Sequence, residues 1–380
     1  MRIIRIIRNK ARVLPGALIL ILPLFWGCSR RAPQSPAEAR VLSREGPAAE
    51  QAETVPFTDS AGRTVTVPAK ITRVVPSGSL AQTFLLSIAP DLLCAVSGSY
   101  SAEEAEFIPP AVLGLPVVGQ FYGTADLNYE EIAAIGPEIV IDIGAPKKSI
   151  VQDMDAITQA ISIPAVHITA ALDSTPDAFR TLGKLLGREE RGEALAAFCE
   201  KTLAAAAEIR AGAGNRKKQV IYCTGKTGLN VIAAGSFHAE VLDFMSENRA
   251  VVDSPSSRGS GNETDLEQLY LWDPELIIFA PDSIYDTVGG DPTWRQIRAI
   301  HNGAYYEVPI GPYNWLGSPP SINRYLGILW LGTLLYPEYA RYDLFTETAE
   351  YYRLFYGYEL SRERYEGLTA KSLTAGGSSR

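Results

Sequence analysis

The chain has 380 residues, 46% of them hydrophobic and 21% charged, which suits two domains with packed cores better than one domain of average size. Its formal net charge is −8. This acidic balance excludes nucleic acid as an expected partner, because little in the chain offsets the repulsion between its carboxylates and phosphates.

The N-terminus has the pattern of an export signal. A basic stretch at residues 2–12 leads into an apolar run at residues 13–26, followed by Gly27 and Cys28. The run is shorter than the ~20 residues that a membrane-spanning helix needs, and it fits a signal-peptide core. A cysteine at this place resembles a bacterial lipobox, so residues 1–27 are predicted to be cleaved and Cys28 to be lipid-anchored. The two aromatic residues just before Gly27 are unusual there, so export without a lipid and an uncleaved anchor stay as alternatives.

Two terminal segments are predicted to lack a fixed structure. Residues 28–54 are rich in Ala, Pro, Glu and Arg and show no hydrophobic periodicity, which indicates a flexible tether. A random coil of this length spans on the order of 30 Å, which suits a protein held to a membrane at one end. Residues 366–380 are predicted to form a disordered tail.

The first half of the folded chain alternates strands and helices. Two short strands flank a turn at residues 59–62, and a strand at 71–75 ends just before a helix at 80–88. The elements predicted after these are a strand at 92–96, a helix at 129–135, a strand at 139–143, a helix at 150–161 and a strand at 165–168. In the helix at 150–161, the apolar residues Ile150, Met154, Ile157 and Ile161 fall on one face. Such alternation indicates a mostly parallel sheet covered by helices on both faces.

A long helix is predicted at residues 189–209, which contain no proline. It would be roughly 30 Å long, enough to cross from one lobe to another. Strand–helix alternation resumes at residues 219–223 and continues to about residue 356. The predicted fold is therefore α/β, with two Rossmann-like lobes of mostly parallel sheets bridged by this single helix. The expected boundaries are 55–187 for the N-terminal lobe, 188–211 for the helix and 212–365 for the C-terminal lobe.

An internal repeat supports two related lobes. Residues 130–141 align without gaps on residues 267–278, and each copy contains a short amphipathic helix, a Pro-Glu turn and a buried strand. Helix–turn–strand units also recur by chance in α/β proteins, but the Glu, Pro and Glu positions are in register here.

The order and spacing of several segments resemble the ABC-importer binding proteins for iron–siderophores, haem and cobalamin. The matching pieces run from residue 57 to about residue 339, and they are 58–75, 128–140, 267–278, 294–309, Trp315 and 327–331. The resemblance implies an exported, monomeric protein at the cell surface or in the periplasm, held to the membrane through Cys28. It would capture a ligand between two lobes and deliver it to an ABC permease with its ATPase, with no catalysis and no protein cofactor.

The resemblance also implies the ligand class and two docking residues. A metal chelate is the expected ligand, an iron–siderophore first, so the ligand should contain iron or another metal. A corrinoid, haem and an oxyanion such as molybdate stay open, because ligand choice depends on loop side chains. Glu130 and Glu267 match the family's exposed glutamates that dock onto permease arginines. Each also opens a predicted helix, where a carboxylate complements the helix dipole.

Ligands of open α/β sheets bind at the carboxyl ends of the strands, where loops and helix N-termini converge. In the first lobe Gly144 and Lys147 follow one such strand. The candidate ligand-binding residues are Ser77, Gly78, Ser79, Tyr122 and Gly123 in the first lobe, and Lys226, His238, Arg258, Tyr313, Asn314 and Trp315 in the second.

Each of these candidates also has a structural interpretation. The backbone of residues 77–79 could hold an anion or a carbonyl, or form a simple helix cap. Tyr122, Tyr313 and Trp315 could pack against a ligand ring or belong to the core. Arg258 could pair with ligand oxygens or remain solvated.

His238 is the histidine best placed to reach a metal, since imidazole binds iron and cobalt. No second ligand lies at metal-binding spacing from it, so a hydrogen-bonded histidine at a helix start is favoured, and no metal is expected to be bound directly by the protein.

Two other classes of function remain as alternatives. A two-lobed enzyme would also have a cleft, but the chain lacks both a Gly-x-Gly-x-x-Gly after a strand and a Gly-x-Ser-x-Gly elbow. A lipid-tethered sensor or scavenger would share the fold and would act without a transporter.

Overall fold

The structure is a computed structural model that describes residues 53–122, 126–145, 147–317 and 321–376. All of these residues belong to one compact unit of the chain. The predicted signal peptide, Cys28, nearly all of the tether and Gly123 lie outside the described residues.

The first lobe is built on a parallel three-stranded sheet in the order β3-β4-β5. Val75 of β3 lies opposite Val140 of β4, and Val140 lies opposite Ala165 of β5. An antiparallel hairpin of β1 and β2 precedes this sheet. The strands are β1 (Thr54–Thr58), β2 (Thr64–Pro68), β3 (Val74–Pro76), β4 (Ile139–Gly144) and β5 (Ala165–Thr169). The helices are α1 (Ser79–Ile88), η1 (Pro90–Leu92), α2 (Ala102–Ala105), α3 (Pro110–Leu113), α4 (Tyr129–Ile135), α5 (Ile150–Ile161) and α6 (Thr175–Leu186).

The second lobe contains a mixed sheet in the order β11-β10-β6-β7-β9, with β8 also paired to β6. Strands β8 and β10 each pair parallel to β6, and β11 pairs parallel to β10. Strand β7 pairs antiparallel to both β6 and β9. The strands are β6 (Gln219–Thr224), β7 (Asn230–Val231), β8 (Glu247–Asn248), β9 (Asn262–Glu263), β10 (Leu276–Phe279) and β11 (Tyr305–Glu307). The helices are η2 (Phe237–Ala239), α8 (Glu240–Met245), α9 (Leu266–Trp272), α10 (Tyr285–Val288), η3 (Trp294–Gln296), α11 (Arg298–His301), α12 (Arg324–Leu335), α13 (Leu344–Tyr356) and α14 (Arg362–Thr369).

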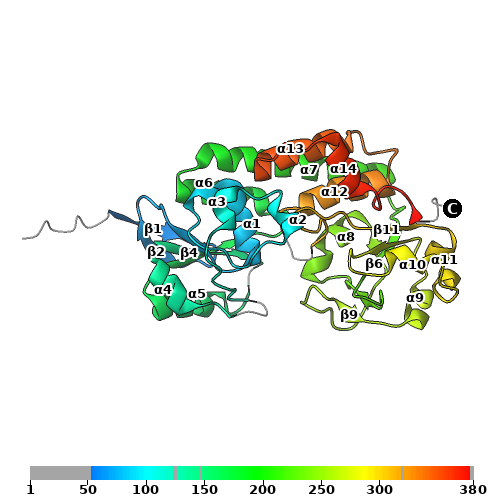
Figure 1. Ribbon diagram of the computed structural model, residues 1–380, viewed down its shortest axis with the longest axis horizontal. Coiled ribbons are helices and arrows are strands. Elements are labelled where there is room, and N and C mark those ends of the chain that lie inside the picture. Colours follow the sequence, from blue (N-terminus) through cyan, green and yellow to red (C-terminus); the bar gives the residue numbers. More distant parts are fainter. Residues whose placement is uncertain (1–52, 123–125, 146, 318–320, 377–380) are drawn as a thin grey trace, which may run out of the picture. The chain divides into compact units, whose positions relative to one another are not determined.

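Helix α7 (Glu189–Ala213) has 25 residues and connects the segments that form the two sheets. Figure 1 shows it running above both lobes. Acidic residues in its first turn and Arg210 in its last turn complement the helix dipole. Gly192 lets α7 approach α6 closely, because an added Cβ would lie 2.6 Å from the Phe179 carbonyl oxygen.

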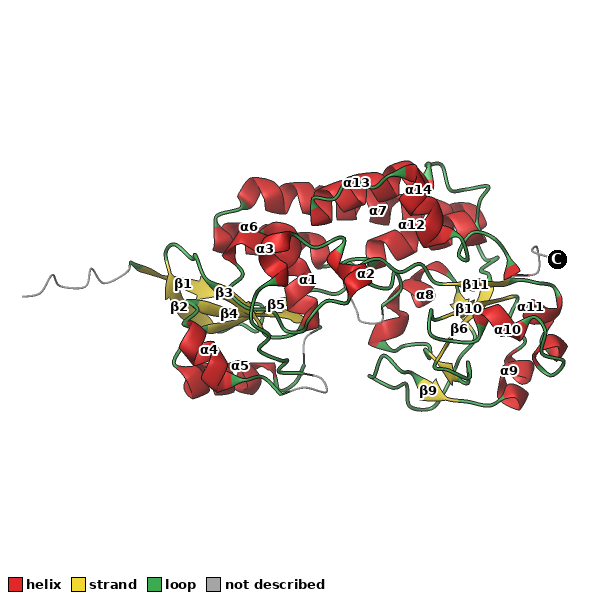
Figure 2. Cartoon of the chain, viewed as in Figure 1, coloured by secondary structure: helices red, strands yellow, loops and turns green. Residues whose placement is uncertain are grey.

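Both faces of each parallel sheet are buried, as near-continuous apolar strands require. In β4, Ile139 and Ile141 belong to one hydrophobic cluster and Val140 to another. Helix α5 covers the second face with Ile150, Met154, Ile157 and Ile161, which confirms the apolar face predicted for this helix. Figure 2 shows the resulting layers of helices around each sheet.

The helices at the C-terminal end of the chain form a layer that both lobes share. The Phe355 ring of α13 packs edge-on against Phe179 of α6, with centroids 5.9 Å apart. The Arg191 guanidinium of α7 donates to the Leu354 carbonyl oxygen at 2.5 Å. The cluster that contains Ile139 consequently also contains Val220 of β6. The two sheets are separate, but one helical layer joins their cores.

Most predicted elements form within a residue or two of the expected ends, and the predicted fold class is confirmed. The strand expected at 92–96 is instead a 3₁₀ turn followed by single bridges, because Leu93 pairs only with Val74 and Val96 only with Val117. Strand β3 starts later than expected. The preceding backbone N–H groups of Thr72 and Arg73 donate to the Glu138 carboxylate rather than to a neighbouring strand.

The prediction that a disordered tail begins at residue 366 is wrong for the first residues of that segment. Helix α14 continues to Thr369, and the Trp330 indole donates to the Ser372 carbonyl oxygen at 2.9 Å. The Ser372 hydroxyl donates to the Glu307 carbonyl oxygen at 2.6 Å. These bonds tie the segment to β11 and α12.

No helix within the described ranges is both long enough and apolar enough to cross a membrane.

Candidate ligand-binding cleft

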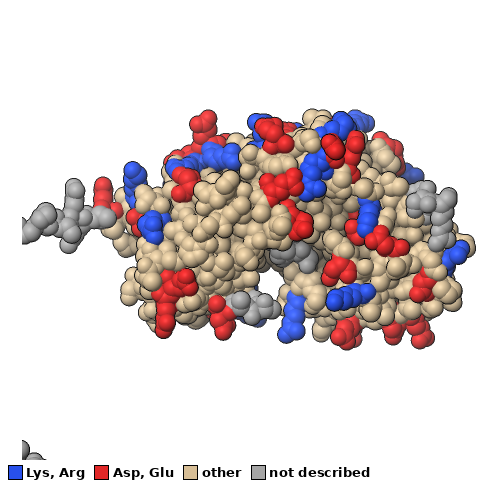
Figure 3. Space-filling view, viewed as in Figure 1, with Lys and Arg blue, Asp and Glu red and all other residues tan. Residues whose placement is uncertain are grey.

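The two lobes meet through the loop that follows β5 and two helices of the second lobe. Leu172, which follows β5, donates its N–H to Glu240 Oε1 at 2.7 Å and accepts a 2.6 Å hydrogen bond from the Tyr325 hydroxyl. Glu240 starts α8 and Tyr325 lies in α12, so this contact joins the first lobe to the second. Figure 3 shows a hollow between the lobes on the side away from α7.

A second contact of this junction involves two tyrosines. Tyr313 follows β11 in the second lobe and is 6% exposed, and Tyr100 belongs to the first lobe. Burial, and then the neighbouring Tyr100 and Tyr356, raise the pKa of Tyr313 well above its ordinary value. Burial also raises the pKa of Tyr100, to about 12, and Gln82 donates to its hydroxyl at 2.7 Å. Both phenols are therefore neutral at physiological pH.

Three strand ends in the first lobe share a buried polar network. The Ser77 hydroxyl after β3 donates to one oxygen of Asp142 in β4. The other Asp142 oxygen lies 2.7 Å from His167 Nδ1 in β5. Thr169 Oγ1 lies 3.3 Å from the other ring nitrogen of His167. Ser77 is 2% exposed, so its side chain orders the strand ends instead of reaching a ligand, which corrects its predicted role.

Gly78 and Ser79 are half-buried at the start of α1. Gly78 is the N-cap, and no side chain caps this end of the helix. The first N–H groups of α1 therefore lack the side-chain partner that a simple cap would supply. Their role in holding an anion stays a prediction.

Tyr122 and Lys147 form the most polar part of the first lobe's rim. The Lys147 ammonium lies 2.9 Å from the centroid of the Tyr122 ring, and the Tyr122 hydroxyl donates to Asp153. Burial lowers the pKa of Lys147, and this effect outweighs the opposing influence of Asp142 and Asp153. Burial and then the hydrogen bond to Asp153 raise the pKa of Tyr122. The Lys147 ammonium is therefore a partly desolvated cation that forms no ion pair with any described residue.

The second lobe presents two exposed cations at its strand ends. Lys226 follows β6 in a turn that Gly225 enters with φ of +74°. Arg258 lies in the loop before β9, and its backbone carbonyl accepts from Gly261 at 2.9 Å. Only glycine fits at position 261, since a Cβ would lie 2.3 Å from the Val231 carbonyl oxygen. The backbone of this loop is thus held in place while the Arg258 guanidinium has no partner among the described residues.

His238 is a hydrogen-bonded histidine, as the sequence favoured. It lies in η2 and is 9% exposed. Its Nδ1 lies 2.6 Å from the Gly317 carbonyl oxygen and its Nε2 lies 3.2 Å from the Ser257 carbonyl oxygen. Both ring nitrogens are therefore engaged with the loops that carry Tyr313 and Arg258. Within the described ranges, no group of three or more His, Cys, Asp or Glu side chains is arranged to hold a metal ion.

Asn314 and Trp315 were predicted to contact the ligand, and the structure corrects both predictions. Asn314 is 2% exposed and donates to the Tyr222 hydroxyl at 2.8 Å, while its side-chain oxygen accepts from Leu316 at 2.7 Å. Trp315 is fully buried, and Gly327 of α12 packs directly on its carbonyl oxygen. These residues fold the loop that carries Tyr313, so their effect on a ligand is indirect.

The predicted docking residues occupy equivalent places in the two lobes. Glu130 is the second residue of α4 and Glu267 is the second residue of α9, and both are exposed. Asn128 and Asp265 cap these helices by accepting from the N–H three residues further on. Figure 1 shows both helices at the edge of the lobes that lies away from α7.

The sequence analysis missed the buried polar residues of the first lobe's strand ends and those that hold the junction together. Asp142 and His167 lie inside apolar strands, and Glu240, Arg324 and Tyr325 lie on helices of the second lobe. One signal was available, since a single aspartate within the run Ile-Val-Ile-Asp-Ile at 139–143 is costly to bury without partners. Nothing in the local sequence indicates that Glu240 meets Leu172, because that contact depends on how the lobes pack.

Two α/β lobes connected by one long helix, with a hollow between them, have the architecture of a solute-binding protein. The model of the periplasmic binding protein family matches residues 85–310, and the chain belongs to this family.

An ABC transporter solute-binding protein from Sulfurospirillum deleyianum has 29% sequence identity and a TM-score of 0.76, over 83% of this chain and 99% of that one. The molybdate-binding protein MolA of Haemophilus influenzae shares the fold, with 17% identity and a TM-score of 0.62 over 81% of this chain and 99% of its own. The Fe(3+)-citrate-binding protein YfmC of Bacillus subtilis is 24% identical over 185 residues, which are 47% of this chain and 56% of that relative. The match therefore spans little more than half of YfmC. The family and these neighbours are solute-binding proteins rather than enzymes, and the family carries no protein cofactor.

Proposed function

We propose that the chain is the exported, lipid-anchored binding component of an ABC importer, and that it captures an anionic metal chelate between its lobes. The observation that carries this proposal is the set of unpaired cations at the strand ends of both lobes. Lys147 belongs to the first lobe, and Lys226 and Arg258 belong to the second. Cations without a counter-charge favour a ligand that supplies the negative charge itself.

A ferric chelate is the ligand class that we favour. The resemblance of the chain to iron–siderophore binding proteins and the partial match to a protein named for ferric citrate both support it. Carboxylate and catecholate chelates of Fe³⁺ carry net negative charge, and their oxygens accept hydrogen bonds from ammonium and guanidinium groups.

Calorimetric titration of the purified chain tests this proposal. We expect a ferric chelate, either ferric citrate or a ferric siderophore, to bind with a Kd on the order of 1 µM or tighter. The same chelator without iron should bind more weakly. Haem, cobalamin and molybdate are the matched competitors. Tight binding of one of these with no response to ferric chelates would contradict the iron assignment, and no binding to any of them would contradict the proposed ligand class.

Glu130 and Glu267 are proposed to dock the loaded protein onto arginines of the permease. Replacing both with alanine is expected to reduce ligand uptake by cells about tenfold or more, because rim charges set the rate and register of association. Ligand affinity of the purified variant should stay unchanged. The matched control is Glu131→Gln, an exposed first-turn glutamate of the same helix. If the two glutamates serve only the helix dipoles, the control and the double variant will transport equally well.

The lipid anchor is proposed at Cys28, from the sequence pattern described above. Cys28→Ala is expected to move the protein from the membrane fraction to the soluble exported fraction, because acylation needs the thiol. Retention of this variant in membranes would favour the uncleaved anchor instead.

A further inference from the structure

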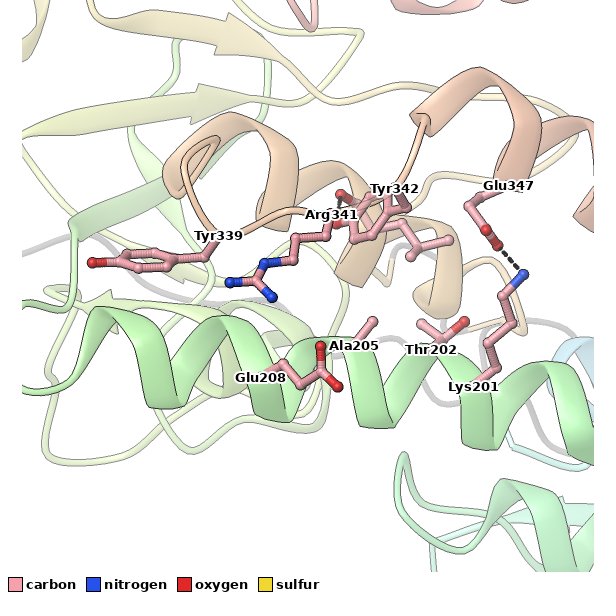
Figure 4. Close-up of a pocket in the computed structure, with 9 residues that line it drawn as sticks. Lys201, Thr202, Ala205, Glu208, Tyr339, Arg341, Tyr342 and Glu347 are labelled. Atoms are coloured by element: carbon pink, nitrogen blue, oxygen red, sulfur yellow. Dashed lines mark hydrogen bonds and ion pairs between the residues drawn. The ribbon is translucent and has the colours of Figure 1, made fainter.

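A small pocket lies on α7, between this helix and the segment that joins α12 to α13. It encloses about 190 Å³, and Figure 4 shows the side chains that line it. At ~30 Å³ per molecule of liquid water, this volume is roughly that of six waters. The pocket is separate from the hollow between the lobes, which opens on the side away from α7.

Two tyrosines form the walls of the α7 pocket, and two glycines make room for them. The Tyr339 ring lies against Gly212 of α7, where an added Cβ would come within 2.4 Å of the ring. The Tyr342 hydroxyl lies against Gly332 of α12 and donates to the Leu329 carbonyl oxygen at 2.6 Å. These close contacts fix both rings, so the pocket is a built feature of the fold.

Thr202 supplies an unpartnered polar group inside the pocket. It is 1% exposed, and its hydroxyl has no hydrogen-bond partner. Helical threonines in the same protein behave differently. The hydroxyls of Thr333, Thr348 and Thr369 each donate to the carbonyl oxygen four residues earlier. Figure 4 shows the Thr202 side chain rising from α7 into the space below Tyr342. A buried hydroxyl without a partner costs about 1–3 kcal/mol, so an occupant that bonds to it is favoured.

The charged side chains around the pocket are equal in kind at its two ends: each end has cationic and acidic groups. At one end these groups form ion pairs, and at the other end, among the described residues, they do not. The Lys201 ammonium is neutralised by Glu347 at 2.7 Å and Glu350 at 3.0 Å. At the other end, Arg341 and Glu208 carry opposite charges, and neither forms an ion pair with a described residue. Figure 4 shows both charged groups at the same end of the pocket, near Ala205. A bare anion or cation would leave one of the two unpaired, whereas a molecule with adjacent opposite charges would pair with both.

We propose that the α7 pocket binds a small zwitterion of the α-amino-acid class. The carboxylate pairs with the Arg341 guanidinium, the ammonium pairs with the Glu208 carboxylate, and a polar atom of the ligand bonds to the Thr202 hydroxyl. The short side chain lies along Ala205 under the Tyr342 ring. This site is independent of the ligand proposed for the cleft.

Thermal unfolding of the full purified chain with a matched set of small probes tests this proposal. The probes are L-serine and L-alanine, which carry both charges, propionate, which carries only the carboxylate, and ethylamine, which carries only the ammonium. For a Kd near ~1 mM, about 10 mM amino acid should raise Tm by ~2–4 °C. Propionate and ethylamine should give no shift.

Three variants connect the shift to the pocket. Arg341→Gln and Glu208→Gln change exposed residues and should abolish the shift, and Thr202→Val should reduce it while leaving the Tm without ligand equal or higher. The control is Arg353→Gln on α13, an exposed arginine outside the pocket, which should retain the full shift. The double variant Lys147→Gln with Arg258→Gln removes two cations of the cleft. If the amino acid still raises the Tm of this variant, the amino acid binds in the α7 pocket and not in the cleft. The proposal is overturned if no amino acid shifts Tm, or if the shift is the same in Arg341→Gln and Arg353→Gln.

Discussion

Glu240→Gln is expected to lower the free energy of unfolding by about 3–5 kcal/mol, because it leaves a buried guanidinium without its counter-charge. Arg324 is 1% exposed and pairs with Glu240 Oε2. Among the described residues, its guanidinium also donates to the Ser321 carbonyl oxygen at 3.2 Å and lies 5.3 Å from the centre of the Phe237 ring. Neither supplies the negative charge that offsets desolvation. The amide oxygen of the variant can still accept from Leu172, but its NH2 group then faces the Arg324 guanidinium, so the variant loses the hydrogen bond to Arg324 as well as the charge.

Urea unfolding measures this loss, which at ~1–3 kcal/mol per molar corresponds to a fall in midpoint of at least about 1 M. Glu240→Gln combined with Arg324→Met should lose less than Glu240→Gln alone, since the pair is then removed as a unit. The exposed control is Arg180→Gln, whose partners Glu193 and Glu200 lie at the surface, and it should cost less than about 1 kcal/mol. If Glu240→Gln is as mild as Arg180→Gln, the guanidinium is compensated by other groups.

The same pair bears on function because of where it lies. One Glu240 oxygen holds Arg324 within the second lobe, and the other accepts from Leu172 of the first lobe. Tyr325, next to Arg324, donates to the carbonyl oxygen of the same Leu172. Both backbone groups of one first-lobe residue are thus bound by the second lobe. The relative position of the strand ends depends on this contact, as does any ligand held by both.

The elements that sequence reasoning placed well are those whose signals are local. Helix α5 follows from its apolar spacing, and its four buried residues are the ones expected. Helices α4 and α9 follow from the repeated amphipathic pattern and from the Pro-Glu turns after it. The strand expected at 92–96 failed because an apolar run alone does not tell whether a neighbouring strand is available for pairing.

The candidate site could be predicted less well, for a physical reason. Strand ends can be located from the sequence, but the direction of each side chain depends on tertiary packing. Asn314 and Trp315 follow a strand, yet both are buried in the core. Asn314 donates to the Tyr222 hydroxyl, and Gly327 packs against the Trp315 carbonyl oxygen. Lys147 and Arg258 also follow or precede strands and remain accessible at the rim. Charged side chains in such loops are therefore more reliably exposed than aromatic ones, because burying an unpaired charge is more costly.

Lys147→Gln combined with Arg258→Gln is expected to weaken binding of a ferric chelate about 100-fold or more. A charge-assisted hydrogen bond contributes ~1.5–3 kcal/mol, which is roughly 10- to 150-fold per residue. Lys147 should have the larger effect of the two, since burial already lowers its pKa and an anionic ligand restores the favourable surroundings of its charge.

Calorimetry of the two single variants and the double variant measures these contributions, and two further results test their origin. Lys217→Gln, an exposed lysine beyond the C-terminal end of α7, should bind like the unmodified protein. The affinity of the unmodified protein should fall as salt rises, and the double variant should show a smaller dependence, because screening acts on the charges that it lacks. Equal affinities for the double variant and Lys217→Gln would mean that the ligand is recognised without these cations, and the anionic class would then lose its main support.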